Sequence, residues 1–445
     1  MEKKVIIVGA GLVGSLWAVY MAKAGYKVTI YERRPDIRKA EISAGKSINL
    51  ALSHRGWKAI RNAGVEDEVK KIAIPMSGRI MHDTDGKLTY QAYGKKNEAI
   101  YSVSRGHLNA IMMDIAENKG RATIHYNHQC IGADLDNGIV QLRDLENNRE
   151  FEDSADLVFA ADGAFSAVRY NAMQKVDRFN YSQFYIEDGY KELLLPADEN
   201  GNYQIEKNAL HIWPRGRFML IALPNEDGSF TCTLFMPYEN HEYAFNDLDS
   251  DEKINVFFKT IFPDFHALMP NLIENWHQNP LSSLSIVRCY PWTMGKFALM
   301  GDSCHATVPF YGQGMNAGFE DCTVMWELYN QHLNWDETFK AYQKTRKADG
   351  DALQDLSLHN YYVMRDHVAN DDFLLQKKIE AKLHEKHPEK WIPLYSQVTF
   401  SHIPYSKAIA QGKKQDLIMK EVLKDPSIHE IWDSEEIEHK ILSKL

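Results

Sequence analysis

Apolar and polar positions follow a recognisable pattern in the first part of the chain. The run Val5-Ile6-Ile7-Val8 is short, apolar and bounded by glycine, which is typical of a buried strand. Residues 12–24 have a helical pattern that Gly25 closes. A second apolar run covers residues 27–31. The pattern predicts a strand–helix–strand unit that begins close to the first residue.

Two later apolar runs have the same character. Residues 156–161 end at Asp162-Gly163, and residues 297–300 end at Gly301-Asp302. Strand ends with short polar turns, far apart in the sequence, indicate one discontinuous nucleotide-binding domain.

The segment between these two runs has a different pattern. Four strands are predicted there, separated by turn clusters rich in Pro, Asn, Asp and Gly; they cover residues 190–194, 209–213, 218–223 and 230–236. The pattern favours an antiparallel sheet rich in aromatic residues. Such a sheet is either solvated on one face or the wall of a substrate pocket. Beyond about Glu320 the pattern is helical to the end.

Composition and charge narrow the classes of protein. The 445 residues are 44% hydrophobic and 25% charged, an ordinary globular mixture. A formal net charge of -10 disfavours nucleic acid as a partner. Five scattered cysteines without metal or redox spacing indicate a reducing compartment. The uncharged residues 5–22 are interrupted by three glycines, so we interpret them as strand, turn and helix, not as a membrane span or signal peptide.

The first turn carries the spacing Gly9-x-Gly11-x-x-Gly14, with Glu32 at the end of the next strand. Gly9 permits a tight turn, Gly11 lets a pyrophosphate approach, and Gly14 lets helix and strand pack closely. The helix N-terminus favours phosphate, and Glu32 is placed to accept hydrogen bonds from ribose. A glycine-rich loop without ligand is the alternative. Arg33 and Arg34 leave open the recognition of a 2′-phosphate.

Two motifs favour FAD over other dinucleotides. The segment Asp162-Gly163-Ala164-Phe165-Ser166-Ala167-Val168-Arg169 and the pair Gly301-Asp302 resemble the two further fingerprints of the flavoprotein aromatic hydroxylases. The resemblance implies that Asp302 accepts from a ribityl hydroxyl of FAD and that the Asp162 region lies where flavin and nicotinamide nucleotide both pass. A plain helix N-cap is the alternative for Asp302.

The glycine-rich segment Pro309-Phe310-Tyr311-Gly312-Gln313-Gly314-Met315-Asn316-Ala317-Gly318 follows Asp302. A helix that begins near Gly314 would direct N–H groups at the flavin pyrimidine and stabilise reduced flavin by about 0.3–1 kcal/mol. A tight helix–helix junction is the alternative. Because no second dinucleotide fingerprint follows a later strand, NADPH is expected to bind transiently, without its own Rossmann unit.

These observations predict an α/β fold with a Rossmann-like FAD-binding domain, an antiparallel-sheet substrate domain and a C-terminal helical region. The predicted bounds are 1–75, 97–178 and 285–325 for the FAD-binding domain, 76–96 and 179–284 for the substrate domain, and 326–445 for the helical region.

A narrower resemblance covers most of the chain, to about Tyr405. Five segments are similar to the kynurenine 3-monooxygenases, a family within these hydroxylases: 47–56, 210–215, 230–237, 309–321 and 392–400. The resemblance implies that L-kynurenine, NADPH and O₂ give 3-hydroxykynurenine, NADP⁺ and water through a flavin C4a-hydroperoxide. The substrate's aniline nitrogen already activates its ring, so no catalytic acid or base is predicted. A hydroxylase for another aromatic amino or phenolic acid, or a flavin-binding protein without turnover, are the alternatives.

The same resemblance implies substrate-binding residues. Arg79 is expected to pair with the amino-acid carboxylate, since an arginine fork fits a carboxylate bidentately. Tyr93 and Tyr395 add hydroxyl donors at that end, and Asn360 holds the amino-acid head. Four further residues line the ring or contact the ketone or amine: Phe235, Phe310, Tyr311 and Gln313. Without the resemblance, Arg79 would be interpreted as part of a surface salt bridge and the aromatic residues as part of the core. Asn360 would be interpreted as a helix residue whose polar groups are already hydrogen-bonded.

The predicted cofactor contacts are drawn from every motif described above. They are Gly9, Gly11, Val13, Gly14, Glu32, Arg33, Arg34, Ala51, Arg105, Cys130, Asp162, Asp302, Gly314, Met315 and Asn316. No metal site is predicted, because His384 and His387 lack a carboxylate or cysteine at ligand spacing. The animal enzymes end in a hydrophobic membrane segment, whereas this chain ends in charged residues such as Glu435 and Glu436. We therefore expect a soluble, cytoplasmic, bacterial form.

Overall fold

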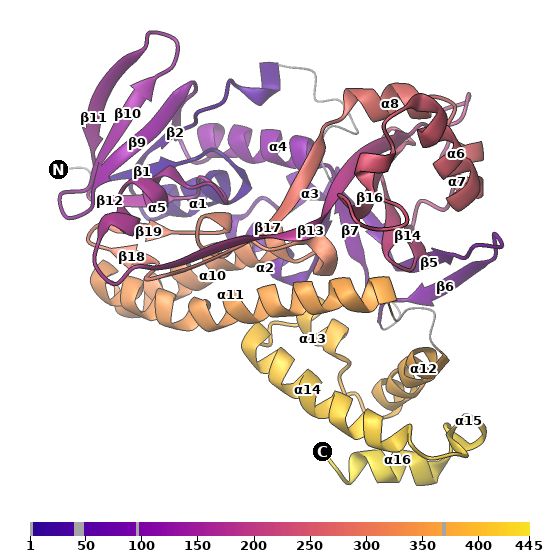
Figure 1. Cartoon of the computed structure of the whole chain (residues 1–445). Helices are drawn as coiled ribbons and strands as arrows, with labels where there is room; N and C mark the ends of the chain where they lie inside the picture. The colour runs from indigo at the N-terminus through magenta and orange to yellow at the C-terminus, as the bar shows by residue number, and fades with distance from the viewer. Residues whose placement is uncertain (1–2, 40–48, 95–97, 367–370) are drawn as a thin grey trace.

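The computed structural model describes residues 3–39, 49–94, 98–366 and 371–445. Ser47 and Ile48 of the predicted segment 47–56 lie outside these residues. The fold combines sheets and helices, which confirms the predicted α/β class. Figure 1 shows two sheet-based regions side by side and a group of C-terminal helices below them.

A six-stranded sheet forms the core of the first region, in the order β18-β19-β12-β1-β2-β8. Its strands are β1 (Lys4–Val8), β2 (Lys27–Tyr31), β8 (Thr123–His125), β12 (Leu157–Ala160), β18 (Thr293–Met294) and β19 (Phe297–Leu299). The four strands predicted from apolar runs, β1, β2, β12 and β19, are parallel and adjacent. Their carboxyl ends therefore meet at one edge, which brings the predicted motifs together.

Helices and two small sheets surround this core. The helix α1 packs against α4 and α10. The helices of this region are α1 (Leu12–Lys23), α2 (His54–Ala63), α3 (Glu66–Lys70), α4 (Arg105–Asn118), α5 (Ala167–Asn171), α9 (Asp302–His305) and α10 (Gly314–His332). One small sheet contains β3 (Leu50–Leu52), β7 (Ile100–Val103) and β4 (Ile74–Met76), and the other contains β11 (Arg149–Ser154), β10 (Ile139–Asp144) and β9 (His128–Asp134).

A seven-stranded sheet forms the second region, in the order β17-β13-β16-β15-β14-β5-β6. The strands are β5 (Gly78–His82), β6 (Leu88–Ala92), β13 (Asn180–Leu195), β14 (Ala209–Arg215), β15 (Phe218–Pro224), β16 (Phe230–Pro237) and β17 (Leu281–Tyr290). Two details correct the predictions. The β14–β5 pair is parallel, so the sheet is mixed. The predicted boundary between 284 and 285 falls inside β17, which stays paired with β13 on both sides of it.

Both faces of this sheet are covered. One face packs on the helices α6 (Asp251–Ile261), α7 (Pro263–Ala267) and α8 (Leu272–Gln278) through an apolar cluster that includes Trp213 and Leu234. The alternate residues, such as Phe235, face the other way and pack with Phe310 and Tyr361. Every residue of β16 is buried. A sheet solvated on one face, the first alternative above, is therefore wrong for β16.

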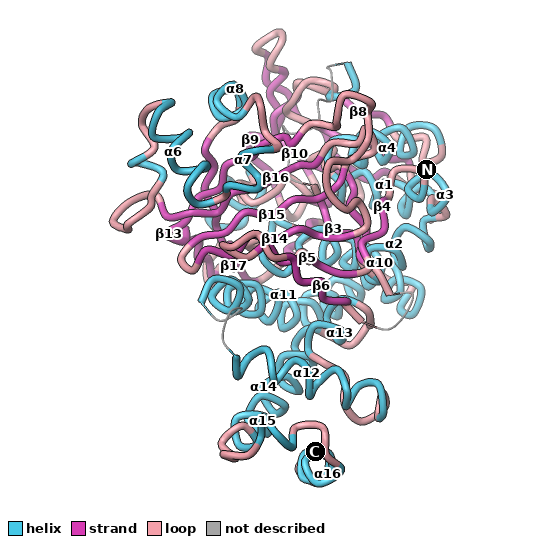
Figure 2. Tube along the Cα trace, turned by 90° about the vertical axis from the view of Figure 1, so that its right-hand side faces the viewer, coloured by secondary structure: helices cyan, strands magenta, loops and turns pink. Residues whose placement is uncertain are grey.

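The last quarter of the chain, from α11 onwards, is helical in its described part, as the pattern predicted. The helices are α11 (Trp335–Asp366), α12 (Asp371–Lys386), α13 (Leu394–Thr399), α14 (Tyr405–Val422), α15 (Ile428–Ile431) and α16 (Glu435–Leu442). The long α11 runs below the sheets, and α12 to α16 extend beyond it in Figure 2. No helix in the described part of the chain combines the length and apolarity needed to span a membrane.

Candidate active site

The glycines in the turn after β1 have two different roles. Gly9 has φ +101°, and a Cβ there would lie 2.6 Å from the Ala161 carbonyl oxygen. A Cβ on Gly14 would lie 2.0 Å from the Gly9 carbonyl oxygen, so Gly14 is required for helix–strand packing. A Cβ on Gly11 would meet nothing within 4 Å. The open space at Gly11, in front of the first N–H groups of α1, fits a pyrophosphate.

Glu32 follows β2 and is 5% exposed. Its carboxylate accepts from the Ala10 N–H at 2.9 Å and from Arg34 Nε at 2.8 Å. Burial alone would raise the pKa of Glu32, but the hydrogen bonds and charge of Arg34, with the Ala10 N–H, lower it below the usual value. Glu32 is therefore held ionised beside the glycine turn, ready to accept from ribose. Arg34 is the partner of Glu32, and Arg33 is exposed next to it.

Asp162 lies directly after β12. Its Oδ2 accepts from the N–H groups of Ala167 at 2.7 Å and Val168 at 3.3 Å. Its Oδ1 is buried and has no hydrogen-bond partner among the described residues. Cys130 in β9 lies near Asp162. Burial and the negative charge of Asp162 raise the pKa of the Cys130 thiol to about 12. The unsatisfied oxygen of Asp162 is the kind of group that a bound ligand completes.

Asp302 is the first residue of α9 and is exposed. The residue that caps α9 is Gly301, with φ +60°, so the N-cap alternative for Asp302 is wrong. The Gly301 N–H donates to the buried Asp321 carboxylate at 2.8 Å, which fixes this turn from below. The Asp302 carboxylate therefore stays available at the strand ends.

The start of α10 faces the same edge. Gly314, Met315 and Asn316 form its first turn, where N–H groups have no partner within the helix. The Asn316 side chain is occupied, because its amide donates to the Ala51 carbonyl at 2.8 Å and its oxygen accepts from the Ser53 N–H at 2.9 Å. Its backbone N–H, not its side chain, is thus the group that suits a flavin.

Two other predicted cofactor residues have different surroundings. The Val13 side chain packs against glycines, since a Cβ on Gly318 would lie 2.7 Å from Val13 Cγ2. Arg105 is the exposed first residue of α4.

The predicted carboxylate-binding residues are brought together by three elements. Arg79 lies in β5, Tyr93 just after β6, and Tyr395 in α13. The Tyr93 and Tyr395 rings stack with centroids 5.2 Å apart. The Tyr93 hydroxyl is buried and makes no hydrogen bond of ordinary length and angle with the described residues, and the Tyr395 hydroxyl is the polar group next to it. Arg79 donates through Nε to Gln91 Oε1 at 2.8 Å.

Electrostatics support this grouping. Burial raises the pKa of Tyr93 well above its usual value, Tyr395 adds to the rise, and the positive charge of Arg79 opposes it. Burial likewise raises the pKa of Tyr395 to about 12, again against the charge of Arg79. Both phenols are therefore hydrogen-bond donors next to a guanidinium group, a set of groups suited to a carboxylate.

The aromatic residues predicted to line the substrate ring pack near one another and near Tyr395. The ring centroids of Phe235 and Phe310 are 4.9 Å apart, and those of Tyr311 and Tyr395 are 5.8 Å apart. The amide of Asn360 in α11 donates to the Phe310 carbonyl oxygen at 2.7 Å. Asn360 thus holds the segment that carries Phe310 and Tyr311.

Gln313 contacts two other elements of the protein. It is 2% exposed, and its Oε1 accepts from Ser53 Oγ at 3.3 Å and from the Tyr405 hydroxyl at 3.2 Å. The Oε1 atom of Gln313 thus joins the start of α2 to α14, and the contact of Gln313 with the substrate stays a prediction.

Sequence reasoning missed Tyr361. Its ring lies 4.4 Å from Phe310 between centroids, and its hydroxyl donates to the buried Asp188. Burial and the Asp188 carboxylate raise the pKa of Tyr361. The signal was weak, since Tyr361 directly follows Asn360 but Asp188 is 173 residues away in sequence.

A buried ion-pair cluster below the site was also missed. Glu320 pairs with Arg55 at 2.5 Å and with Arg346 at 2.7 Å, and Arg346 also pairs with Asp321 at 2.8 Å. Burial would raise the pKa of Asp321, but His305 and Arg346 lower it to about 2. The cluster ties α2, α10 and α11 together beneath the flavin-facing turn.

Potential metal ligands belong to ion pairs. Ligand atoms of Cys304, His305 and Asp321 lie within 4.8 Å of one another, but Asp321 is already bound by His305, Arg346 and the Gly301 N–H. His387 has a carboxylate partner that the spacing did not predict, Glu438 at 2.7 Å. Lys386 also pairs with this carboxylate, so the group is a salt bridge.

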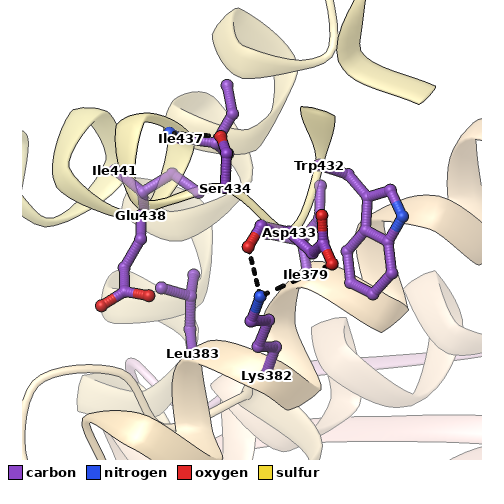
Figure 3. A pocket seen from close by; sticks show the side chains of 9 residues that line it. All are labelled: Ile379, Lys382, Leu383, Trp432, Asp433, Ser434, Ile437, Glu438 and Ile441. Atoms are coloured by element: carbon purple, nitrogen blue, oxygen red, sulfur yellow. Dashed lines mark hydrogen bonds and ion pairs between the residues drawn. The ribbon is translucent and has the colours of Figure 1, made fainter. Parts of the chain in front are cut away.

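Figure 3 shows a small pocket between α12 and the C-terminal segment, and none of its lining residues is a predicted cofactor or substrate residue. Lys382 donates to the Asp433 carbonyl at its rim, and Leu383 and Ile441 are among its apolar lining. It lies in the C-terminal helices, not at the strand ends that gather the predicted residues.

Comparisons with known proteins agree with this geometry. The sequence matches the FAD binding domain family over residues 2–357. Kynurenine 3-monooxygenase of Flavobacterium psychrophilum is 50% identical, over 100% of this chain and 99% of that protein. The chain belongs to the kynurenine 3-monooxygenase family. Its cofactor is FAD, and it is a flavin-dependent monooxygenase, as the resemblance implied.

Family members are not confined to bacteria. Kynurenine 3-monooxygenase of Anopheles gambiae is 43% identical, over 95% of this chain and 87% of that protein. Among solved structures, 2-methyl-3-hydroxypyridine-5-carboxylic acid oxygenase has a TM-score of 0.67 at 19% identity, over 82% of this chain and 94% of that one. Klebsiella pneumoniae HpxO, complexed with FAD and uric acid, has a TM-score of 0.66 at 20% identity, over 84% and 91%. These two structures show the shared fold.

Proposed function

We propose that this protein hydroxylates L-kynurenine at ring position 3, using NADPH and O₂. The observation that carries the proposal is the buried Tyr93 hydroxyl, which makes no hydrogen bond of ordinary length and angle with the described residues and lies with Tyr395 beside Arg79. A buried donor left unsatisfied costs about 1–3 kcal/mol, so a ligand that accepts from it is favoured. Kynurenine offers a carboxylate for this end and an aromatic ring for the other.

At the carboxylate end, Arg79 supplies the charge and the planar fork. Its Nε is used by Gln91, which leaves the terminal nitrogens for a bidentate contact. Tyr93 and Tyr395 add one O–H donor each. Asn360 donates to the Phe310 carbonyl oxygen and so joins α11 to the aromatic side of this group, and its contact with the amino-acid head group stays a prediction.

At the ring end, Phe235, Phe310 and Tyr311 form an apolar wall. All three are less than 9% exposed, so water is kept from the ring. Tyr361 packs behind Phe310 and fixes its orientation. The wall orients the ring through shape, since it offers no acid or base to it.

The cofactor would be held by backbone and carboxylate groups at the strand ends. Gly11 and the start of α1 would receive the pyrophosphate, Glu32 a ribose, and Asp302 the ribityl chain. Bound FAD, once reduced by NADPH, supplies the activated oxygen. The N–H groups at the start of α10 would stabilise negative charge on the reduced ring. The chain itself needs no proton donor for the ring, because the amine of kynurenine already donates electrons into it.

The deciding experiment measures NADPH oxidation by the FAD-loaded protein with and without L-kynurenine, together with the formation of 3-hydroxykynurenine. We expect strong stimulation and a hydroxylated product. Stimulation only by another aromatic amino or phenolic acid would favour a related hydroxylase. No oxidation with any aromatic acid would favour a flavin-binding protein without turnover.

A further inference from the structure

Two buried histidines and an aspartate form a continuous chain of hydrogen bonds in the second region. His82 Nδ1 lies 2.8 Å from Asp264 Oδ2, and His82 Nε2 lies 2.9 Å from His211 Nδ1. His211 Nε2 lies 2.8 Å from the Glu206 carbonyl oxygen. His82 is 4% exposed and His211 1%. The chain joins β5, β14 and α7, and the flavin chemistry described above makes no use of it.

The two ends of this chain set its proton content. A carboxylate oxygen and a backbone carbonyl both lack a proton, so the facing nitrogens must donate. The contact between the two rings needs one more proton. Three protons on two imidazoles give one positive charge, which the Asp264 carboxylate balances. With only two protons, one of the three contacts would place two acceptors face to face.

The surroundings favour the ionised form of this chain. Trp213 stacks on His82 with centroids 3.9 Å apart and donates through Nε1 to Asp264 Oδ2 at 2.7 Å. Burial would raise the pKa of Asp264, but hydrogen bonds from His82 and Trp213 lower it. Burial lowers the pKa of His211 to about 4, which makes His211 the neutral member.

The other charged groups facing the chain come from β14, from the turn after β5 and from Glu206, whose negative charge acts on His211. Arg215 donates to the His82 carbonyl at 2.9 Å and to the Ile261 carbonyl at 2.7 Å, and it also contacts the Asp83 carbonyl. The carboxylates of Asp264 and Asp83 both act on the Arg215 charge. The end of β5 is thus fixed from β14 through Arg215 and from α7 through Asp264.

This anchor lies at the edge of the sheet that carries the substrate-binding residues. The strand β6 is the outermost strand and is mostly exposed, and β5 connects it to β14. Residues of β5 alternate, so His82 faces the helices α6 to α8 while Arg79 faces Tyr93 and Tyr395. The β5–β6 hairpin thus presents Arg79 and Tyr93 on one side and is held by His82 on the other.

We propose that the Asp264–His82–His211 chain is a positioning device for Arg79 and Tyr93, which holds the β5–β6 hairpin in register. The effect on substrate binding rests on the proposed function, whereas the effect on the hairpin does not. These are positioning residues, since none of the three touches the Arg79 side of the strand.

The test uses the FAD-loaded Asp264→Asn protein, which keeps the size of the side chain but removes the charge that balances the third proton. We expect KM for L-kynurenine to rise tenfold or more, with kcat changed less than twofold and FAD content unchanged. Amide hydrogen exchange of residues 78–92 should become at least tenfold faster. The matched control is Asp251→Asn, which removes an exposed carboxylate that holds His277 at 2.7 Å, and both readouts should stay at wild-type values.

Unchanged exchange and KM in Asp264→Asn, or equal losses in kcat and KM, would overturn the proposal. If kynurenine fails to stimulate the wild type, the function fails, while the exchange of the hairpin still decides this inference.

Discussion

The cofactor region and the substrate region of this molecule are built in opposite ways. The cofactor region uses main chain at the ends of parallel strands, with glycine where side chains would collide and three carboxylates at its rim. The substrate region uses side chains from β5, the end of β6, β16, the segment before α10, α11 and α13. These elements are spread along most of the sequence. The cofactor region thus depends on the backbone conformation, and the substrate region depends on the positions of its side chains.

The largest effect is expected from Gly14→Ala in the cofactor region. Alanine normally stabilises a helix by about 1 kcal/mol relative to glycine. Here the new Cβ would lie 2.0 Å from the Gly9 carbonyl oxygen, so we expect a loss of about 3 kcal/mol or more. Thermal unfolding of the apo and FAD-loaded forms measures it.

Gly11→Ala is the matched control for this change. Its Cβ would meet nothing within 4 Å, so the apo protein should change by less than about 1 kcal/mol. Because the methyl group enters the space assigned to the pyrophosphate, FAD affinity should fall tenfold or more. If the two variants behave alike, the division between a packing glycine and a ligand glycine is wrong.

The second effect is expected from Arg79→Ala in the substrate region. Loss of one member of a buried charge pair costs about 2–5 kcal/mol, which raises KM for kynurenine roughly 30-fold or more. Arg79→Lys keeps the charge but loses the fork, so it should be intermediate. FAD binding, measured by flavin absorbance, should be unchanged in both, and flavin loss would mean that the two regions are not separable.

The third effect is expected from Tyr93→Phe, which removes a hydroxyl that makes no hydrogen bond of ordinary length and angle with the described residues. The free protein should be as stable as the wild type or slightly more stable, because an unsatisfied buried group is removed. KM should nevertheless rise about tenfold, since a hydrogen bond to a charged group contributes about 1.5–3 kcal/mol. A lower melting temperature with unchanged KM would show that the hydroxyl serves packing instead.

The same contrast explains what the sequence predicts. The spacing of Gly9, Gly11 and Gly14 and the strand ends at Asp162 and Asp302 predict the cofactor region, because local turn geometry requires those residues there. The position of Gln313 could not be predicted, since its direction depends on Tyr405, which lies 92 residues away. The bond between His82 and Asp264 spans 182 residues and leaves no local pattern. The family resemblance, and not periodicity, indicated Arg79 and Tyr93.

The smallest effect is expected from Glu32→Gln, which tests whether a side chain matters in the region built from main chain. The amide still accepts one hydrogen bond but loses the charge, so FAD affinity should fall only about five- to tenfold, near 1 kcal/mol.

The pH dependence of flavin retention follows from the lowered pKa of Glu32. A carboxyl group with a depressed folded-state pKa stabilises the protein above its ordinary value of 4.5, and this contribution is lost only as pH falls through the lower value. Flavin retention in the wild type should thus be flat from neutral pH down to the ordinary carboxyl value of 4.5 and fall only at lower pH, while Glu32→Gln lacks this step. A loss of FAD-binding free energy in Glu32→Gln as large as the loss of folding stability in Gly14→Ala would mean that the ribose contact, and not the backbone conformation, dominates FAD binding.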